Sequence, residues 1–417
     1  MLTMPAGWLA RAFVTALLVI TTIAALRPMI SYRAIALGAG PVAVGVVAAA
    51  YALLSFAVAV PIGRRVDRFG EVRFLLAGTV VMTLVAGALL GIDTVPGLVA
   101  AQAVLGSGHM LCVVALQSLV ASDGDQAQRD ARFGAFTVVV SFGLIVGPAL
   151  GGLVGGRGGA GPLQVFAVAV GIALAAVLVA ASLWRWPPPR TRAAAPGAGA
   201  GARGAAIPTA IRLARLPGMP QAMLASLTVL AGIDILTAYL PAYGESHGIA
   251  VGTVGLLLST QAASSMTARI MMLPLMRLLG RRGLLASSML STACALAVLP
   301  LAGARTAVLF ALMAVGGVGL GLAQPITMSW VAGRAPAGAR ATALGVRLTA
   351  NRLGQLLLPA GVGLIAGAAG ISAIFVALGV MLAGSATLVL RTAFGDDAPI
   401  PRRPRADRVT DRRDPSA

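Results

Sequence analysis

Apolar residues form long, nearly uninterrupted runs along the chain, and short segments rich in Arg, Pro and Gly separate them. A helix needs about 20 apolar residues to cross the hydrocarbon core of a bilayer, and these runs reach that length. The runs expected to cross are residues 10–30, 42–62, 74–92, 96–120, 133–155, 163–184, 221–243, 251–275, 284–303, 306–332, 342–367 and 370–391. The pattern therefore predicts an all-α integral membrane protein with twelve transmembrane helices.

Residues 185–220 interrupt this pattern. The segment is rich in Pro, Gly and Ala with scattered Arg, a composition typical of a flexible linker. The expected parts are an N-terminal six-helix bundle over 1–184, a cytoplasmic linker over 185–220, a C-terminal six-helix bundle over 221–391 and a disordered cytoplasmic tail over 392–417.

The two halves resemble each other when one is shifted along the other by 211 residues. The pairs that then coincide are Arg129 and Arg340, Gly134 and Gly345, Gly143 and Gly354, Pro148 and Pro359, and Gly152 and Gly363. A shift of 210 residues places Gly70 on Gly280, within the turns that follow the second and eighth runs. Nearly the same offset at two places predicts parallel six-helix repeats. Two pseudo-symmetric bundles around a central cavity are the architecture of an alternating-access transporter.

Hydrophobic residues make up 58% of the 417 residues and charged residues only 11%, against about 25% charged residues in soluble domains. This composition excludes a soluble globular enzyme, a coiled coil and a disordered chain, because all of these need more charge. Cys112 and Cys294 lie inside apolar runs without neighbouring metal-ligand residues. We therefore expect two buried thiols, and no disulfide, metal or cofactor.

The formal net charge is +19, and all 32 basic residues are arginine. Such a charge suggests nucleic acid as partner in a soluble protein. Here 25 arginines fall in segments that a twelve-helix topology with both termini inside assigns to the cytoplasm, three fall outside and four lie within spans. Since this is the positive-inside pattern, the sequence predicts a multi-pass protein of a cell membrane, of the bacterial inner-membrane kind. Both termini are expected to be cytoplasmic, and nucleic-acid binding is not expected.

The fifth run has a regular glycine pattern, GAFTVVVSFGLIVGPALGG, from Gly134 onward. Its glycines recur every four residues from position 143 to position 155, so they share one helix face that a neighbouring backbone can approach closely. Pro148 lacks a backbone donor and permits a kink. A generic small-residue packing face is the alternative interpretation.

The turn between the second and third runs reads GRRVDRFGEVR over residues 63–73. We expect Gly63 to close the helix, Asp67 and Arg68 to begin the loop, and Gly70 to supply a positive-φ turn. The acid can pair with arginines of the facing bundle and form a latch that breaks when the cavity opens inward. The alternative is a solvated positive-inside loop.

These two motifs resemble those of the major facilitator superfamily, and more narrowly those of its twelve-span drug:proton antiporter branch. The residues that carry the resemblance are Gly63, Asp67, Arg68, Gly70 and Arg73 in the loop, and Gly134, Gly143, Gly147, Pro148, Gly151 and Gly152 in the fifth run. The resemblance covers the whole chain. It implies gating by the loop motif and an interface between the halves at the fifth run.

The chain also departs from this family pattern. The loop has Arg65 where an aliphatic residue is usual, and Glu71 and Val72 where basic residues are usual. In the fourth run, Gln102 stands where the family often has an arginine implicated in proton relay. Because an amide does not titrate, proton transfer by that route is in question.

Ionisable residues within spans are costly and usually face a cavity or a partner. Asp234 is the only acid well inside a span, and the resemblance places its helix and that of Arg27 beside the cavity. We therefore expect an Arg27–Asp234 pair. Its carboxylate is a candidate proton carrier, and a static ion pair between helices is the alternative.

Further candidates for the cavity or proton path are Gln102 and His109 in the fourth run, Arg269 in the eighth, and Asn351 and Arg352 in the eleventh. His109 is a possible proton carrier, although a histidine hydrogen-bonded between helices is a common structural feature. Arginines outnumber acids within the spans by four to one, which favours an anionic or neutral amphipathic substrate.

The sequence thus predicts a proton-coupled exporter of an amphipathic small molecule, whose partners are that substrate, protons and the lipid bilayer, with a monomer as the expected state. One alternative keeps the fold and imports a nutrient or organic anion. Another is an integral-membrane acyl or glycosyl transferase, which needs polar clusters at the membrane ends. With two histidines and 13 acids, ten of them in cytoplasmic loops and tail, the sequence offers no such cluster.

Overall fold

The computed structural model describes residues 7–121, 126–156, 161–185, 210–335 and 340–391, and all regular structure in these ranges is helical. The helices are α1 (Gly7–Ala36), α2 (Pro41–Phe69), α3 (Glu71–Ala88), α4 (Val95–Ala121), α5 (Gln126–Gly155), α6 (Gly161–Ser182), α7 (Ala210–Ala214), α8 (Met219–Ser246), α9 (Val251–Ile270), α10 (Met272–Ala302), α11 (Thr306–Arg334), α12 (Arg340–Ala369) and α13 (Ser372–Arg391). The all-α prediction is confirmed.

Ten of the described helices are long and apolar enough to cross a membrane. In α2 the apolar segment among the residues with described side chains is Pro41–Phe56, and the side chains of residues 57–64 lie outside the described part. The helix α9 falls outside the ten because Ser259, Gln261, Ser265 and Arg269 interrupt its apolar run. Cys294 is exposed, so the prediction that it is buried is wrong. An apolar run places a residue in the bilayer, and its side chain can then face lipid instead of protein.

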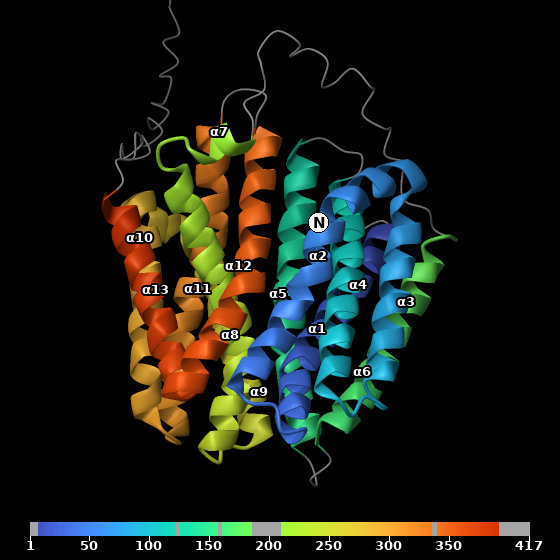
Figure 1. Cartoon of the computed structure of the whole chain (residues 1–417). Coiled ribbons are helices and arrows are strands. Elements are labelled where there is room, and N and C mark those ends of the chain that lie inside the picture. Colours follow the sequence, from blue (N-terminus) through green and yellow to red (C-terminus); the bar gives the residue numbers. More distant parts are fainter. Residues whose placement is uncertain (1–6, 122–125, 157–160, 186–209, 336–339, 392–417) are drawn as a thin grey trace, which may run out of the picture.

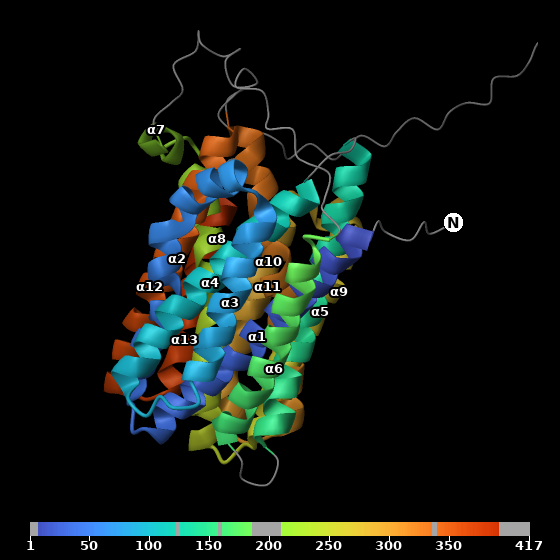
Figure 2. The same cartoon turned by 90° about the vertical axis from the view of Figure 1, so that its right-hand side faces the viewer.

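The helices form two groups that stand side by side (Figure 1). One group contains α1–α6, on the right of the view, and the other contains α8–α13, on the left. We call the end where α1 stops and α2 starts the lower end, at the bottom of Figure 1, and the opposite end the upper end. The helices run from end to end, as the view from the side also shows (Figure 2). The short α7 lies within the predicted linker, whose residues 186–209 are outside the described part, as are residues 392–417.

Two glycine contacts join the groups near the lower end. In one, α9 lies so close to α5 that a side chain at Gly255 would collide with the carbonyl oxygen of Pro148. In the other, α2 lies so close to α12 that a side chain at Gly45 would collide with the carbonyl oxygen of Pro359. Pro148 and Pro359 are one of the repeat-related pairs, so the internal repeat appears in three dimensions as two equivalent seams.

The turns at Gly70 and Gly280 also correspond. Gly70 has φ 92° and ψ 143°, and Gly280 has φ 68° and ψ 166° inside α10. Only glycine adopts such angles readily, so each ends one helical stretch and starts the next. The prediction that Gly63 closes α2 is wrong, because the helix continues to Phe69 and ends at the positive-φ glycine.

Candidate functional site

A buried ion pair links the two helix groups near the middle of the molecule. Arg27 lies on α1 and Asp234 on α8, and the guanidinium Nη1 approaches the carboxylate Oδ1 to 2.6 Å. The side chains are only 14% and 6% exposed. The contact expected from the sequence is therefore present. A charge-assisted hydrogen bond of this length in a buried place is among the stronger polar contacts a protein makes.

The other carboxylate oxygen of Asp234 accepts a hydrogen bond from an amide. Gln355 of α12 donates from Nε2 at 2.6 Å, and its Oε1 accepts from Nη1 of Arg352 at 2.9 Å. Nη2 of Arg352 then reaches Sδ of Met110 on α4 at 3.5 Å. The polar chain thus begins in the first helix group, crosses to the second and returns to the first.

An aromatic residue adds a second branch. The Arg27 guanidinium carbon lies 4.4 Å from the ring centroid of Tyr51 on α2, within the range of a cation–π contact. The Tyr51 hydroxyl is hydrogen-bonded to Nδ1 of His109 on α4, and Nε2 of His109 is buried without a partner. We call Arg27, Tyr51, His109, Asp234, Arg352 and Gln355 the central network.

Local sequence explains how these side chains meet. Arg352 and Gln355 are three residues apart, so they share one face of α12. Gly106 lets α4 lie directly against α2, because a side chain there would collide with the carbonyl oxygen of Tyr51. His109 follows one turn later and so comes within reach of the Tyr51 side chain.

Three other predicted candidates lie outside the central network. Gln102 and Asn351 are buried, and each has a carbonyl oxygen without a hydrogen-bond partner. Arg269 donates from Nε to the carbonyl oxygen of Gly321 at 3.2 Å, which ties α9 to α11 within one helix group. Arg269 thus bridges helices, whereas the two amides keep unused acceptors.

The glycine motif of α5 serves two neighbours. Added side chains at Gly143, Gly147 and Gly151 would meet α1, the tightest approach being 2.6 Å to Cβ of Ala24 from position 147. A side chain at Gly152 would come within 2.9 Å of Cα of Gly255 in the other helix group. The motif therefore packs α5 both inside its own group and across the seam. Gly134 is exposed, with no atom of another helix within 4 Å of an added side chain.

The loop motif lies at the upper end. Asp67 and Arg68 belong to α2, as Gly63 does, so the prediction that they begin the loop is wrong. The side chains of Asp67 and Arg68 are outside the described part of the structure. Gly70 forms the positive-φ turn, and the side chain of Arg73 is exposed. The latch between Asp67 and the facing bundle stays a prediction.

The sequence alone does not predict that Tyr51 contacts Arg27 or that Gln355 contacts Asp234. The available signal for Gln355 is its spacing of three from Arg352. For Tyr51 the signal is a polar aromatic group in an apolar run. Neither signal identifies the partner helix, which only the packing of α2 and α12 against α1 and α8 decides.

A transporter embedded in the membrane is the class of protein that these two matched helix groups and their shared buried charges define. The sequence profile of the Major Facilitator Superfamily matches residues 12–304 and 222–414. The chain therefore belongs to the Major Facilitator Superfamily, and it is a multi-pass transporter and not an enzyme.

Solved transporter structures share this fold. The nucleoside transporter NupG is 13% identical, with a TM-score of 0.73, covering 93% of this chain and 100% of that one. A bacterial homologue of the lysosomal transporter Spinster, in an inward-facing and unoccupied conformation, is 14% identical, with a TM-score of 0.74, covering 93% and 95%. The peptide transporter POT is 16% identical, with a TM-score of 0.74, covering 92% and 93%. No curated protein matches the sequence.

Proposed function

We propose that this transporter is a proton-coupled exporter that moves an amphipathic small molecule outward by alternating access. The observation that carries the proposal is the Arg27–Asp234 pair, which lies buried between the two helix groups. Alternating access moves these groups against each other. A charge pair that spans them therefore contributes differently to the energy of each state.

Protonation of Asp234 supplies the coupling step. A neutral carboxyl group no longer compensates the Arg27 cation, so the attraction between α1 and α8 falls. An isolated buried charge is costly, and the freed guanidinium favours a state in which water or a substrate acceptor reaches it. His109 is the second candidate carrier, because its Nε2 is free to accept or donate a proton.

The charges of the network indicate the substrate. It contains two guanidinium groups and one carboxylate, and within the described part of the chain Arg352 reaches an amide oxygen and a thioether but no carboxylate. The network therefore carries one unmatched positive charge near Asp234. An anionic group, or a neutral group with strong acceptors, compensates this charge better than a cation does.

The same unmatched cation favours one alternative, an importer that carries an organic anion inward together with protons. The exporter and the importer would have the same fold and the same central network. Direction of transport is what separates them.

Transport by the purified chain in proteoliposomes tests both proposals. Carboxyfluorescein is the anionic probe and ethidium the cationic one, each followed under an imposed pH gradient. An exporter of this kind exchanges its substrate for protons. A proton flux into the compartment that the dye leaves is therefore expected to drive dye movement. Dye flux that ignores the gradient would overturn proton coupling, and gradient-driven movement of dye together with protons would select the importer.

The proposal requires that both termini face the cytoplasm and that the lower end faces outward. The contacts across the groups at Gly45, Gly152 and Gly255 then close the outer side. In this arrangement the substrate is expected to load at the central network from the cytoplasm.

A further inference from the structure

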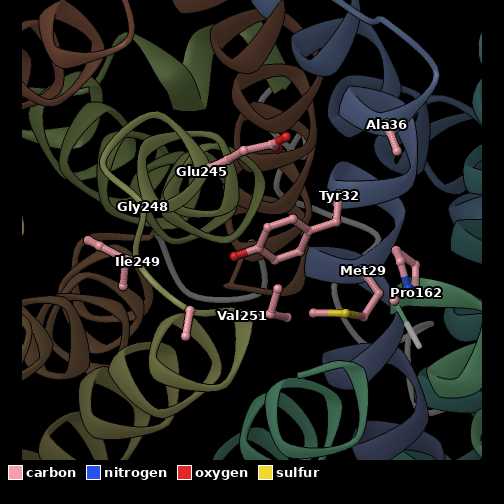
Figure 3. Close-up of a pocket in the computed structure, with 10 residues that line it drawn as sticks. Met29, Tyr32, Ala36, Pro162, Glu245, Gly248, Ile249 and Val251 are labelled. Carbon is pink, nitrogen blue, oxygen red and sulfur yellow. The ribbon is translucent and has the colours of Figure 1, made fainter. Parts of the chain in front are cut away.

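A cavity of about 440 Å³ lies at the lower end, between the two helix groups. Met29 and Tyr32 of α1 and Pro162 of α6 line one side (Figure 3). Glu245 of α8 and Val251 of α9 line the other. Its volume is within the range of small-molecule sites, about 300–1,000 Å³. None of the central-network residues lines it, so it is a separate place in the molecule.

The Tyr32 hydroxyl is an unused polar group inside this cavity. The residue is only 8% exposed, and its hydroxyl has no hydrogen-bond partner. Figure 3 shows the ring reaching from α1 toward the other helix group, with the hydroxyl directed into the space between Glu245, Ile249 and Val251. A side chain at Gly244 would lie 3.5 Å from this oxygen. Because a buried polar group without a partner is costly, the hydroxyl favours an occupant with a polar group.

The Glu245 carboxylate gives the cavity its charge. Glu245 makes no ion pair among the described residues, and its charge acts on the Tyr32 hydroxyl. The remaining lining residues, such as Met29, Ile249 and Val251, are apolar. A carboxylate, a hydroxyl and an apolar wall together match an ammonium group attached to an apolar body.

We propose that this cavity, here called the lower-end site, binds a small organic ammonium ion, with Glu245 as its counter-ion and the Tyr32 hydroxyl as a hydrogen-bond acceptor. Both helix groups supply the lining, so the complete site exists only while the lower ends are together. A ligand stabilises the state it binds by its differential affinity. Occupation therefore holds the lower end closed and slows the transport cycle from a place outside the central network.

Binding of benzylamine, protonated at neutral pH, tests the proposal without any transport measurement. The purified full chain in nanodiscs of phosphatidylglycerol is titrated, and its melting temperature is followed. Benzylamine is expected to raise the melting temperature in a saturable way, and benzyl alcohol and benzoate are not. An equal effect of benzyl alcohol would overturn the ammonium assignment.

Three variants locate the binding. Glu245→Gln removes the counter-ion and is expected to weaken benzylamine binding about tenfold or more. Tyr32→Phe removes one neutral hydrogen bond and is expected to weaken it about threefold to tenfold. Asp93→Asn removes an exposed carboxylate outside the cavity and is the matched control, expected to bind as wild type. Wild-type binding by both Glu245→Gln and Tyr32→Phe, or an equal loss in Asp93→Asn, would show that the site lies elsewhere.

A lipid headgroup offers the same chemistry, because phosphatidylethanolamine carries a primary ammonium. Titration is therefore repeated in nanodiscs that contain this lipid. If the benzylamine effect is lost in these nanodiscs but not in nanodiscs that contain another neutral lipid, the site is assigned to the headgroup. An unchanged effect assigns it to soluble amines. Both results support an ammonium site.

Discussion

At the scale of single residues, the central feature is that Asp234 lies between a cation and an amide. Arg27 approaches one carboxylate oxygen and Gln355 the other, each at 2.6 Å. A carboxylate with a hydrogen-bond partner at each oxygen can be a permanent structural group. It can also be a proton carrier whose protonation changes the contacts among α1, α8 and α12. The two roles predict different behaviour when both Arg27 and Asp234 are replaced by neutral residues.

Asp234→Asn leaves the Arg27 cation without its counter-ion, so the free energy of unfolding is expected to fall by about 3–5 kcal/mol. Arg27→Gln combined with Asp234→Asn removes both charges and is expected to recover most of that loss. Thermal unfolding of the purified chain in detergent measures both effects. Asp93→Asn, an exposed acid, is the control.

Transport by the double variant separates the two roles. With Asp234 as proton carrier, the double variant is stable but its dye flux no longer responds to the pH gradient. Gradient-driven flux at the wild-type rate in this variant would mean that the pair is structural only.

At the scale of helices, the positions of glycine decide how closely neighbouring helices approach. On α5, three glycines accept α1, and Gly152 accepts α9 of the other group. On α2, Gly45 accepts the backbone of α12. Without a hydrophobic effect between helices in lipid, such close packing is a main source of association.

Gly147→Leu is expected to destabilise the chain by about 1–3 kcal/mol, because even its Cβ would lie 2.6 Å from Cβ of Ala24. Gly134→Leu lies on the same helix at an exposed position and is the matched control, expected within about 0.5 kcal/mol of wild type. Thermal unfolding in detergent checks this. Equal stability of the two variants would contradict a packing role for the motif.

Gly45→Ala is expected to push α2 away from the carbonyl oxygen of Pro359 and so open the lower end. Gly87→Ala adds a methyl group to α3 where no neighbouring atom lies within 4 Å, so it controls for the gain in helix propensity. Spin labels on the lower ends of α2 and α12 report the distance between them. A longer distance is expected in Gly45→Ala alone, and an unchanged distribution would mean that this seam does not control closure.

At the scale of the whole molecule, the distribution of arginine predicts the orientation in the membrane. Of the 32 arginines, 25 fall in segments that the predicted twelve-helix topology assigns to the cytoplasm, and three fall in segments that it assigns to the outside. Arginine-rich segments stay on the cytoplasmic side during insertion. The predicted orientation therefore places the lower-end site outside and the loading side of the central network inside.

A C-terminal fusion tests this orientation. A fluorescent protein fused after Ala417 is expected to fluoresce, and alkaline phosphatase fused at the same place is expected to be inactive, because both are then cytoplasmic. Phosphatase fused at Arg305, between α10 and α11 at the lower end, is the positive control. Active phosphatase at the C-terminus would reverse the topology and the direction of transport with it.

The sequence by itself determined the all-α membrane fold, the repeat and the one intramembrane acid, because hydropathy, glycine spacing and charge cost are properties of each segment alone. The pairing of Asp234 with Arg27 was expected from the sequence together with the family resemblance, which places both helices beside the cavity. Tertiary structure alone decided that Gln355, Tyr51 and His109 join this pair while Arg269 does not. It also decided where α2 ends and which face of α10 carries Cys294. These outcomes depend on which helices meet and how they rotate, and lipid-facing and protein-facing positions have the same apolar composition.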